Sequence, residues 1–117
     1  MPKYDDKFRT WELALKGLEA LGGVASVADI KRQIVERYPD FKTSNVGTDL
    51  AMLAVNCPGR VNHRGNKRSR RTDSGSEFDR VFRVCTGYYR IYDAALDGVW
   101  ELYEEASTGK VLSRKVL

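Results

Sequence analysis

The stretch RVFRVCTGYYRIY, residues 80–92, decides the fold expected of this chain. It consists of two runs rich in β-branched and aromatic residues, separated by the short break Cys85-Thr86-Gly87. This composition around a glycine predicts a β-hairpin. Side chains alternate between the two faces of a strand, which puts Phe82 and Val84 on the same face. We expect that apolar pair to point toward the helices.

Two helical patterns lie near the start of the chain. Residues 9–21 carry apolar side chains at the spacing of one helical face, and Gly22-Gly23 ends that helix. Ser26 is placed to cap a second helix, which Pro39 stops. The apolar stripe that begins at Trp11 is expected to pack against the second helix and to form core rather than a ligand site.

A third helix is predicted to begin at Ser44 or Asn45, either of which is a good N-cap, and to end at Cys57-Pro58-Gly59. The connection before it, residues 39–43, has the length of a turn, so the second and third helices are expected to form a helix-turn-helix core. The outer face of the third helix is expected to show Thr48, Asp49, Met52 and Asn56.

Residues 60–71, here called the basic segment, carry an unusual concentration of charge. Without their six cations, the 20 Lys and Arg residues of the chain become 14, against 16 Asp and Glu. The positive charge is therefore local, and such a cluster is typical of a surface that neutralises phosphates and releases their counterions. The cations are Arg60, Arg64, Lys67, Arg68, Arg70 and Arg71.

The rest of the chain is expected to be organised around this segment. Residues 60–63 could form a short strand, and residues 65–77 are expected to form a polar loop without core residues. A further strand is predicted at residues 99–103. Residues 1–8 form a polar lead-in, residues 9–103 one domain, and residues 104–117 a tail that could add an edge strand.

The sequence offers little for catalysis, and we expect no enzyme, cofactor or metal site. His63 is the only histidine, and a zinc or nuclease site needs more ligands. Asp73, Glu77 and Asp79 follow the basic segment; they could coordinate a metal, but they are interpreted as neutralising its charge. Cys57 and Cys85 match no metal or redox spacing and are expected to be buried free thiols. Free thiols are typical of the reducing cytoplasm, which is therefore the expected location. The sequence has no apolar run long enough to span a membrane, so no membrane partner is expected.

The order of expected elements resembles the winged helix-turn-helix superfamily, and more narrowly the HARE-HTH type and the winged-helix domains attached to bacterial restriction endonucleases. The fold class is therefore α+β, with three helices followed by a small antiparallel sheet and a long basic wing loop. The resemblance covers residues 9–103. It implies binding to double-stranded DNA, or docking on a nucleic-acid machine, in a restriction, defence or regulatory system of the bacterial cytoplasm or nucleoid, with an associated nuclease as a further partner. The motifs that carry it are the stripe Trp11 to Leu18, the entry Ser26-Val27-Ala28-Asp29-Ile30, the run Phe82 to Tyr92, and Asp97-Gly98-Val99-Trp100.

The third helix departs from a typical recognition helix because it offers no cation for base edges. The hypothesis is therefore DNA binding of low sequence specificity, with the basic segment gripping phosphates. Two alternatives stay open: a protein-docking module that uses the uncharged face around Met52, and a single-strand or RNA binder that stacks bases on Tyr88 or Tyr89. The residues expected to contact DNA are Lys42, Thr43, Ser44, Asn45, Thr48, Arg60, His63, Arg64, Lys67, Arg68, Arg70 and Arg71.

Overall fold

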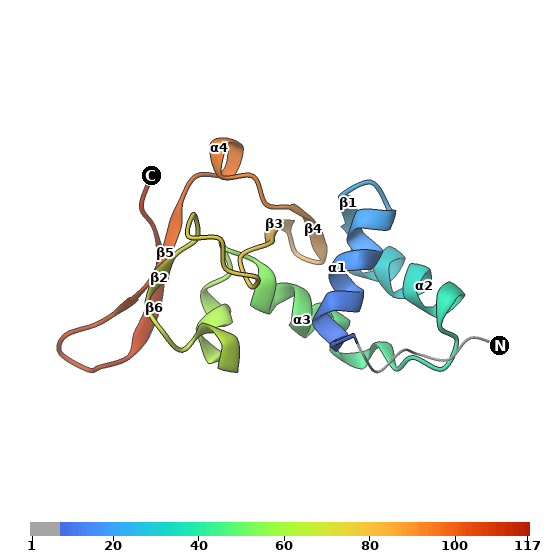
Figure 1. The fold of residues 1–117 in the computed structure, drawn as a ribbon, viewed down its shortest axis with the longest axis horizontal. Helices are drawn as coiled ribbons and strands as arrows, with labels where there is room; N and C mark the ends of the chain where they lie inside the picture. Colours follow the sequence, from blue (N-terminus) through green and yellow to red (C-terminus); the bar gives the residue numbers. More distant parts are fainter. Residues whose placement is uncertain (1–7) are drawn as a thin grey trace.

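The computed structural model describes residues 8–117, so the predicted lead-in lies outside the described residues except for Phe8. The described chain combines helices with two antiparallel sheets and extends 52 × 27 × 24 Å (Figure 1). The helices and the first sheet lie toward one end, and the second sheet lies at the other. No helix among these residues is long and apolar enough to cross a membrane.

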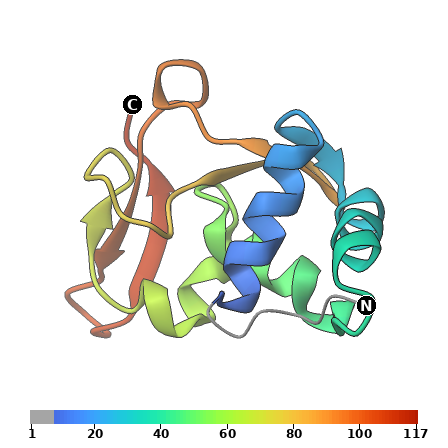
Figure 2. The same cartoon turned by 45° about the vertical axis from the view of Figure 1, so that its right-hand side comes forward.

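Three α-helices build the main core. The first, α1, spans Thr10–Ala20, the second, α2, spans Val27–Arg37, and the third, α3, spans Val46–Leu53 after the 3₁₀ turn η1 at Thr43–Asn45. Figure 2 shows α1 crossing in front of α3 and the first sheet. The predicted helices are confirmed, although α3 ends four residues before the expected Cys57. Their fully buried side chains include Leu18, Ile30, Leu50 and Leu53.

The helix caps follow from local sequence. The backbone N–H of Arg9 donates to Glu12 Oε1 at 3.1 Å at the start of α1. The N–H of Asp29 donates to Ser26 Oγ at 3.1 Å at the start of α2, as a serine N-cap predicts. Gly17 lets the two helices approach closely, because a Cβ there would lie 3.1 Å from Cγ2 of Ile30.

The first sheet has the order β1-β4-β3 and contains a strand that the sequence did not predict. Strand β1, Val24–Ser26, lies between α1 and α2 in the chain. It pairs with β4, Tyr88–Ile91, which also pairs with β3, Val81–Cys85. The expected hairpin is confirmed, but the expectation that all strands follow the three helices is wrong.

The expected orientation of β3 is also wrong. Val81 is fully buried because it bridges Ala54, whose neighbour Val55 donates its N–H to the Val81 carbonyl at 2.9 Å. Val84 is 49% exposed, so the Phe82–Val84 face does not point into the core. A register shift follows Arg83, and the hairpin turns tightly at residues 86–87.

The basic segment and the residues after it are folded. They form the 3₁₀ helices η2, Pro58–Asn62, and η3, Arg64–Asn66, followed by the short strand β2, Arg70–Arg71. Residues 60–63 are therefore not a strand. Residues 65–77 are not a loop without core residues, because Asn66 is fully buried and Thr72 is 5% exposed.

The second sheet has the order β2-β5-β6 and contains the C-terminal tail. Strand β5, Trp100–Glu104, confirms the strand predicted there, and β6, Val111–Lys115, pairs along its whole length. The short helix α4, Ala94–Asp97, leads from the first sheet to the second. A chain of hydrogen bonds joins the two parts, because Trp100 N–H donates to Thr72 Oγ1 at 2.9 Å and Thr72 Oγ1 lies 2.8 Å from the Tyr92 hydroxyl.

Candidate nucleic-acid interface

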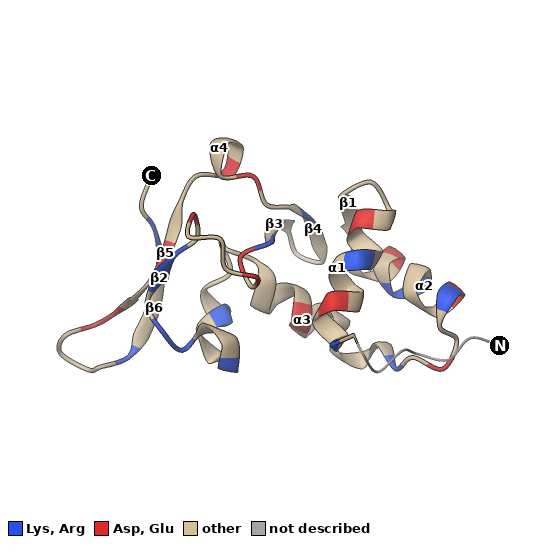
Figure 3. Cartoon of the chain, in the orientation of Figure 1, with Lys and Arg blue, Asp and Glu red and all other residues tan. Residues whose placement is uncertain are grey.

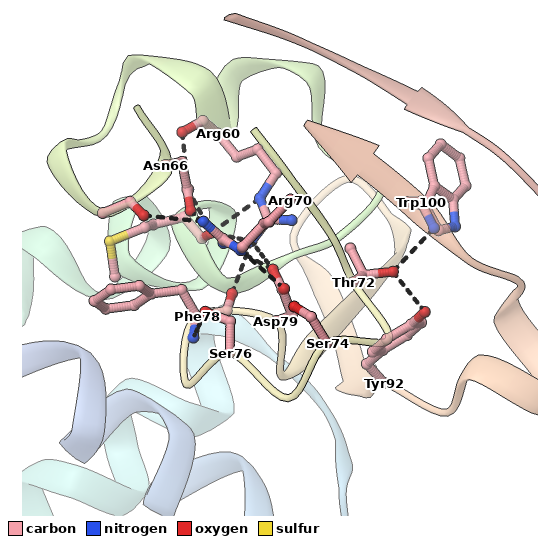
Figure 4. Close-up of polar contacts among 12 residues, drawn as sticks. Arg60, Asn66, Arg70, Thr72, Ser74, Ser76, Phe78, Asp79, Tyr92 and Trp100 are labelled. Carbon is pink, nitrogen blue, oxygen red and sulfur yellow. Dashed lines mark hydrogen bonds and ion pairs between the residues drawn. The ribbon is translucent and has the colours of Figure 1, made fainter. Parts of the chain in front are cut away.

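A buried carboxylate holds the two ends of the basic segment together. Oδ1 of Asp79 accepts from the guanidinium groups of Arg60 and Arg70, each at 2.8 Å, and its Oδ2 accepts from Nε of Arg70 at 3.0 Å (Figure 4). The side chains of Arg60 and Asp79 are each 1% exposed. We call these three residues, together with Asn66, the Asp79 cluster.

The Asp79 cluster fastens the basic segment to the C-terminal end of α3. The Met52 carbonyl in the last turn of α3 accepts from the Arg60 guanidinium at 3.1 Å and from Asn66 Nδ2 at 3.0 Å. The last carbonyls of a helix have no partner within the helix, and cationic donors suit the negative end of its dipole. Asn66 Oδ1 in turn accepts from Arg70 at 2.7 Å, so η2, η3 and β2 are all tied to α3.

The guanidinium group of Arg60 is buried and stabilises the fold. Removal from water lowers the pKa of Arg60, and the adjacent Asp79 carboxylate opposes that shift. A buried charge of this kind is tolerated only when it is paired and hydrogen-bonded. Arg60 therefore cannot reach a phosphate in this structure, and its expected contact with DNA is wrong for that reason.

Three cations of the basic segment remain available to a partner. Arg70 is bound into the Asp79 cluster, and Arg71 pairs with Asp73 at 3.0 Å. These ion pairs agree with the interpretation of Asp73 and Asp79 as neutralising acids, whereas Glu77 forms no ion pair with any residue from 8 to 117. Arg64, Lys67 and Arg68 are exposed and form no ion pair with any residue from 8 to 117. Figure 3 shows the cationic stretch that leads from η3 to β2 below the end of α3.

The other expected contact residues lie at or beside α3. Lys42, Ser44, Asn45 and Thr48 are exposed, and Thr43 is half-buried. None of these five is used by the Asp79 cluster, so the start and outer face of α3 present short polar side chains to solvent.

His63 separates η2 from η3, and its charge acts on Asp49 of α3. Burial raises the pKa of Asp49, while a hydrogen bond from the Thr10 side chain and the charge of His63 lower it. Asp49 Oδ2 is buried and has no hydrogen-bond partner among the described residues. This carboxylate therefore costs stability when it is ionised.

We expect Asp49→Asn to stabilise the fold near neutral pH. Because burial raises the pKa of Asp49, the protonated carboxyl group favours folding. This contribution is fully present below the ordinary carboxyl pKa and is lost as the pH rises through the folded-state pKa. The advantage of the variant should therefore shrink as the pH falls from about 7 to about 4. Urea unfolding of both proteins across this range measures it. Asp40→Asn removes the same charge from an exposed position, and an equal gain in that control would contradict the effect of burial.

The residues expected to serve protein docking or base stacking are in part buried. Met52 is 9% exposed, and Asn56 donates to the Arg83 carbonyl at 2.8 Å, so neither offers an open face for docking. Tyr89 is buried, whereas Tyr88 is 40% exposed, in agreement with the expectation that one of the pair points outward. Cys57 is buried, but Cys85 is exposed beside the hairpin turn, so the expected burial of both thiols is wrong for Cys85.

Sequence reasoning missed the residues that organise this surface. Asp79 and Asn66 were not assigned a structural role, although Asp79 lies between the apolar Phe78 and the strand that begins at Val81. Arg83 was also missed: its guanidinium donates to Thr86 Oγ1 at 3.1 Å within the hairpin. No group of three or more potential metal ligands occurs within residues 8–117.

Comparison with known proteins gives one match. Residues 9–91 match the model of a domain family whose function is unknown. That range runs from the start of α1 to the end of β4 and includes the whole basic segment. No curated protein and no solved structure matches the chain.

Proposed function

We propose that this chain, which belongs to the DUF7669 family of domains of unknown function, binds double-stranded DNA without catalysing a reaction on it. The exposed cations Arg64, Lys67 and Arg68 bind phosphates, and the start and outer face of α3 lie toward the major groove. Binding of this kind has low sequence specificity. The resemblance described above favours a restriction, defence or regulatory setting in the bacterial cytoplasm, next to an associated nuclease.

The order of elements supports this proposal. Helices and strands follow one another as α1–β1–α2–α3–β2–β3–β4, and the order of the first sheet is β1-β4-β3. Three helices followed by the β3–β4 hairpin agree with the resemblance to a winged helix-turn-helix domain, in which α3 would take the place of the recognition helix, whereas β1 departs from the expected order. The β3–β4 turn, which takes the place of the wing, is short. The long basic segment precedes β3 and is proposed to supply the charge that a longer wing would carry.

The attachment of the basic segment to α3 is the observation that carries the proposal. The Asp79 cluster binds this segment to the Met52 carbonyl, so three unpaired cations are held on a folded scaffold next to α3. A binding surface that is already ordered loses less conformational entropy when the partner binds. A flexible tail with the same charge would have to be ordered during binding.

Low specificity follows from the side chains on α3. Base edges in the major groove are discriminated best by bidentate Arg, Asn or Gln contacts. Residues 46–53 contain no Arg, Lys, Asn or Gln, and Asn45 lies just before the helix. Phosphate contacts fix position without reading sequence, so they dominate the proposed complex.

Titration of a fluorescent duplex of about 20 base pairs tests the proposal. We expect a dissociation constant in the micromolar range at low salt and similar affinities for unrelated duplexes. The three unpaired cations of the basic segment should give a log–log salt slope of about −2.7. A single strand of the same length is the matched competitor. No binding at low salt, or tighter binding of the single strand, would overturn the proposal.

A further inference from the structure

A groove between α1 and α2 lies apart from the Asp79 cluster and the basic segment. It encloses about 220 Å³ and is lined by residues of both helices together with Phe8 and Tyr38. Its apolar wall includes Leu13, Gly17 and Ile34, all of which are buried. The groove is therefore a recess with an apolar wall and polar side chains around it, at the helical end of the molecule.

Two cations stand beside this recess without an acidic partner. Lys16 and Arg37 are exposed, and neither forms an ion pair with any residue from 8 to 117. Lys16 Nζ lies 4.7 Å from the centre of the Phe8 ring, and the Arg37 guanidinium lies 5.7 Å from the centre of the Tyr38 ring. These contacts place both charges against aromatic residues that line the groove. None of the described residues that line it is acidic.

Several other exposed arginines are paired, although Arg64 and Arg68 of the basic segment are not. Arg32 pairs with Asp29, Arg71 with Asp73, and Arg114 with Glu101. An apolar recess beside two unpaired cations has the chemistry that complements an apolar side chain flanked by carboxylates.

We propose that this groove binds an acidic peptide segment of a partner protein, which inserts one aromatic or branched aliphatic side chain between α1 and α2. Lys16 and Arg37 then pair with Asp or Glu residues on either side of the inserted residue. A bare phosphate backbone has no group to fill the apolar recess, so the recess favours a peptide over nucleic acid. Because α2 lies on the far side of α1 from the basic segment, as Figure 1 shows, a peptide in the groove leaves the cations of the basic segment accessible to DNA.

Selection from a random 12-residue peptide library on the full 117-residue chain provides the test. We expect the enriched peptides to be net acidic and to share an aromatic or aliphatic residue. Calorimetry with one synthetic selected peptide should then show affinity at least tenfold weaker for the double variant Lys16→Ala, Arg37→Ala. A peptide whose apolar residue is replaced by serine should lose affinity to a similar degree.

The matched control is Arg64→Ala, Lys67→Ala, which removes the same charge from the basic segment and should leave peptide affinity within twofold. A library that yields no enriched peptide, or peptides without acidic bias, would contradict the proposal. It would also be overturned if the control variant lost peptide binding as strongly as the groove variant. Duplex binding by the groove variant is measured in parallel, so failure of the groove and failure of the proposed DNA binding give separate results.

Discussion

Replacement of Asp79 by alanine will lower the free energy of unfolding by about 3–5 kcal/mol, because it leaves the charge of Arg60 buried without a partner. Arg60 is 1% exposed and its guanidinium would keep only carbonyl acceptors, those of Met52 and Phe78. Arg70 would lose the same carboxylate. The loss is a large share of the total stability of a small domain, and urea unfolding followed by circular dichroism measures it.

Two further variants keep this expectation testable if the alanine variant does not fold. Asp79→Asn keeps one acceptor oxygen at the same place and should lose stability while still folding. Asp73→Asn breaks the pair with Arg71, whose side chain is 47% exposed, and should cost no more than about 1 kcal/mol. Equal unfolding midpoints for Asp79→Asn and Asp73→Asn would show that the Asp79 cluster does not hold the fold together.

The local parts of this fold are readable from sequence because their signals are local. Helical periodicity, the Ser26 cap and the glycines after α1 each act within one or two turns, and the structure confirms the three helices. The β3–β4 hairpin is likewise encoded by two adjacent runs. Strand β1 is only three residues long, and its partner β4 lies far along the chain, so no local pattern identifies it.

The basic segment shows where composition misleads. Its many cations and few apolar residues predict a solvated loop, yet Arg60 and Asn66 are among its most buried side chains. Their burial depends on Asp79 and on the Met52 carbonyl, which lie on either side of the segment in the chain. Spacing does not reveal which acid pairs with which arginine, so the sequence does not separate the three available cations from the three that form ion pairs.

The inward face of β3 illustrates a related difficulty. Apolar alternation favours Phe82 and Val84 as the buried pair, but Val81 is the fully buried residue of this strand, and Arg83 shares its face. Arg83 can occupy that face because its long side chain reaches the turn and bonds Thr86, while its backbone N–H donates to Asn56 Oδ1 at 2.8 Å. The inward face of this strand can therefore hold a charged residue, although the alternation of apolar residues alone predicts the opposite.

The largest effect on DNA binding is expected from the triple variant Arg64→Ala, Lys67→Ala, Arg68→Ala. Each cation that neutralises a phosphate contributes about 0.9 to the log–log salt slope, so losing three should reduce the slope by about 2.7. Affinity near 100 mM salt should fall roughly tenfold or more. The three side chains are exposed and lie outside the Asp79 cluster, so the unfolding midpoint should change little. Fluorescence anisotropy with the labelled duplex measures both affinity and slope.

The matched control is Lys16→Ala, Arg32→Ala, Arg37→Ala, which removes three exposed positive charges from α1 and α2 instead. Net charge alone predicts that both triple variants lose affinity equally, because the field far from the protein depends on the total charge. Direct phosphate contact by the basic segment predicts a reduced salt slope only for Arg64, Lys67 and Arg68. The comparison therefore separates a defined interface from general electrostatic attraction. If the salt slope of the Arg64, Lys67, Arg68 variant were unchanged, the DNA-binding surface would have to lie elsewhere than at the end of α3.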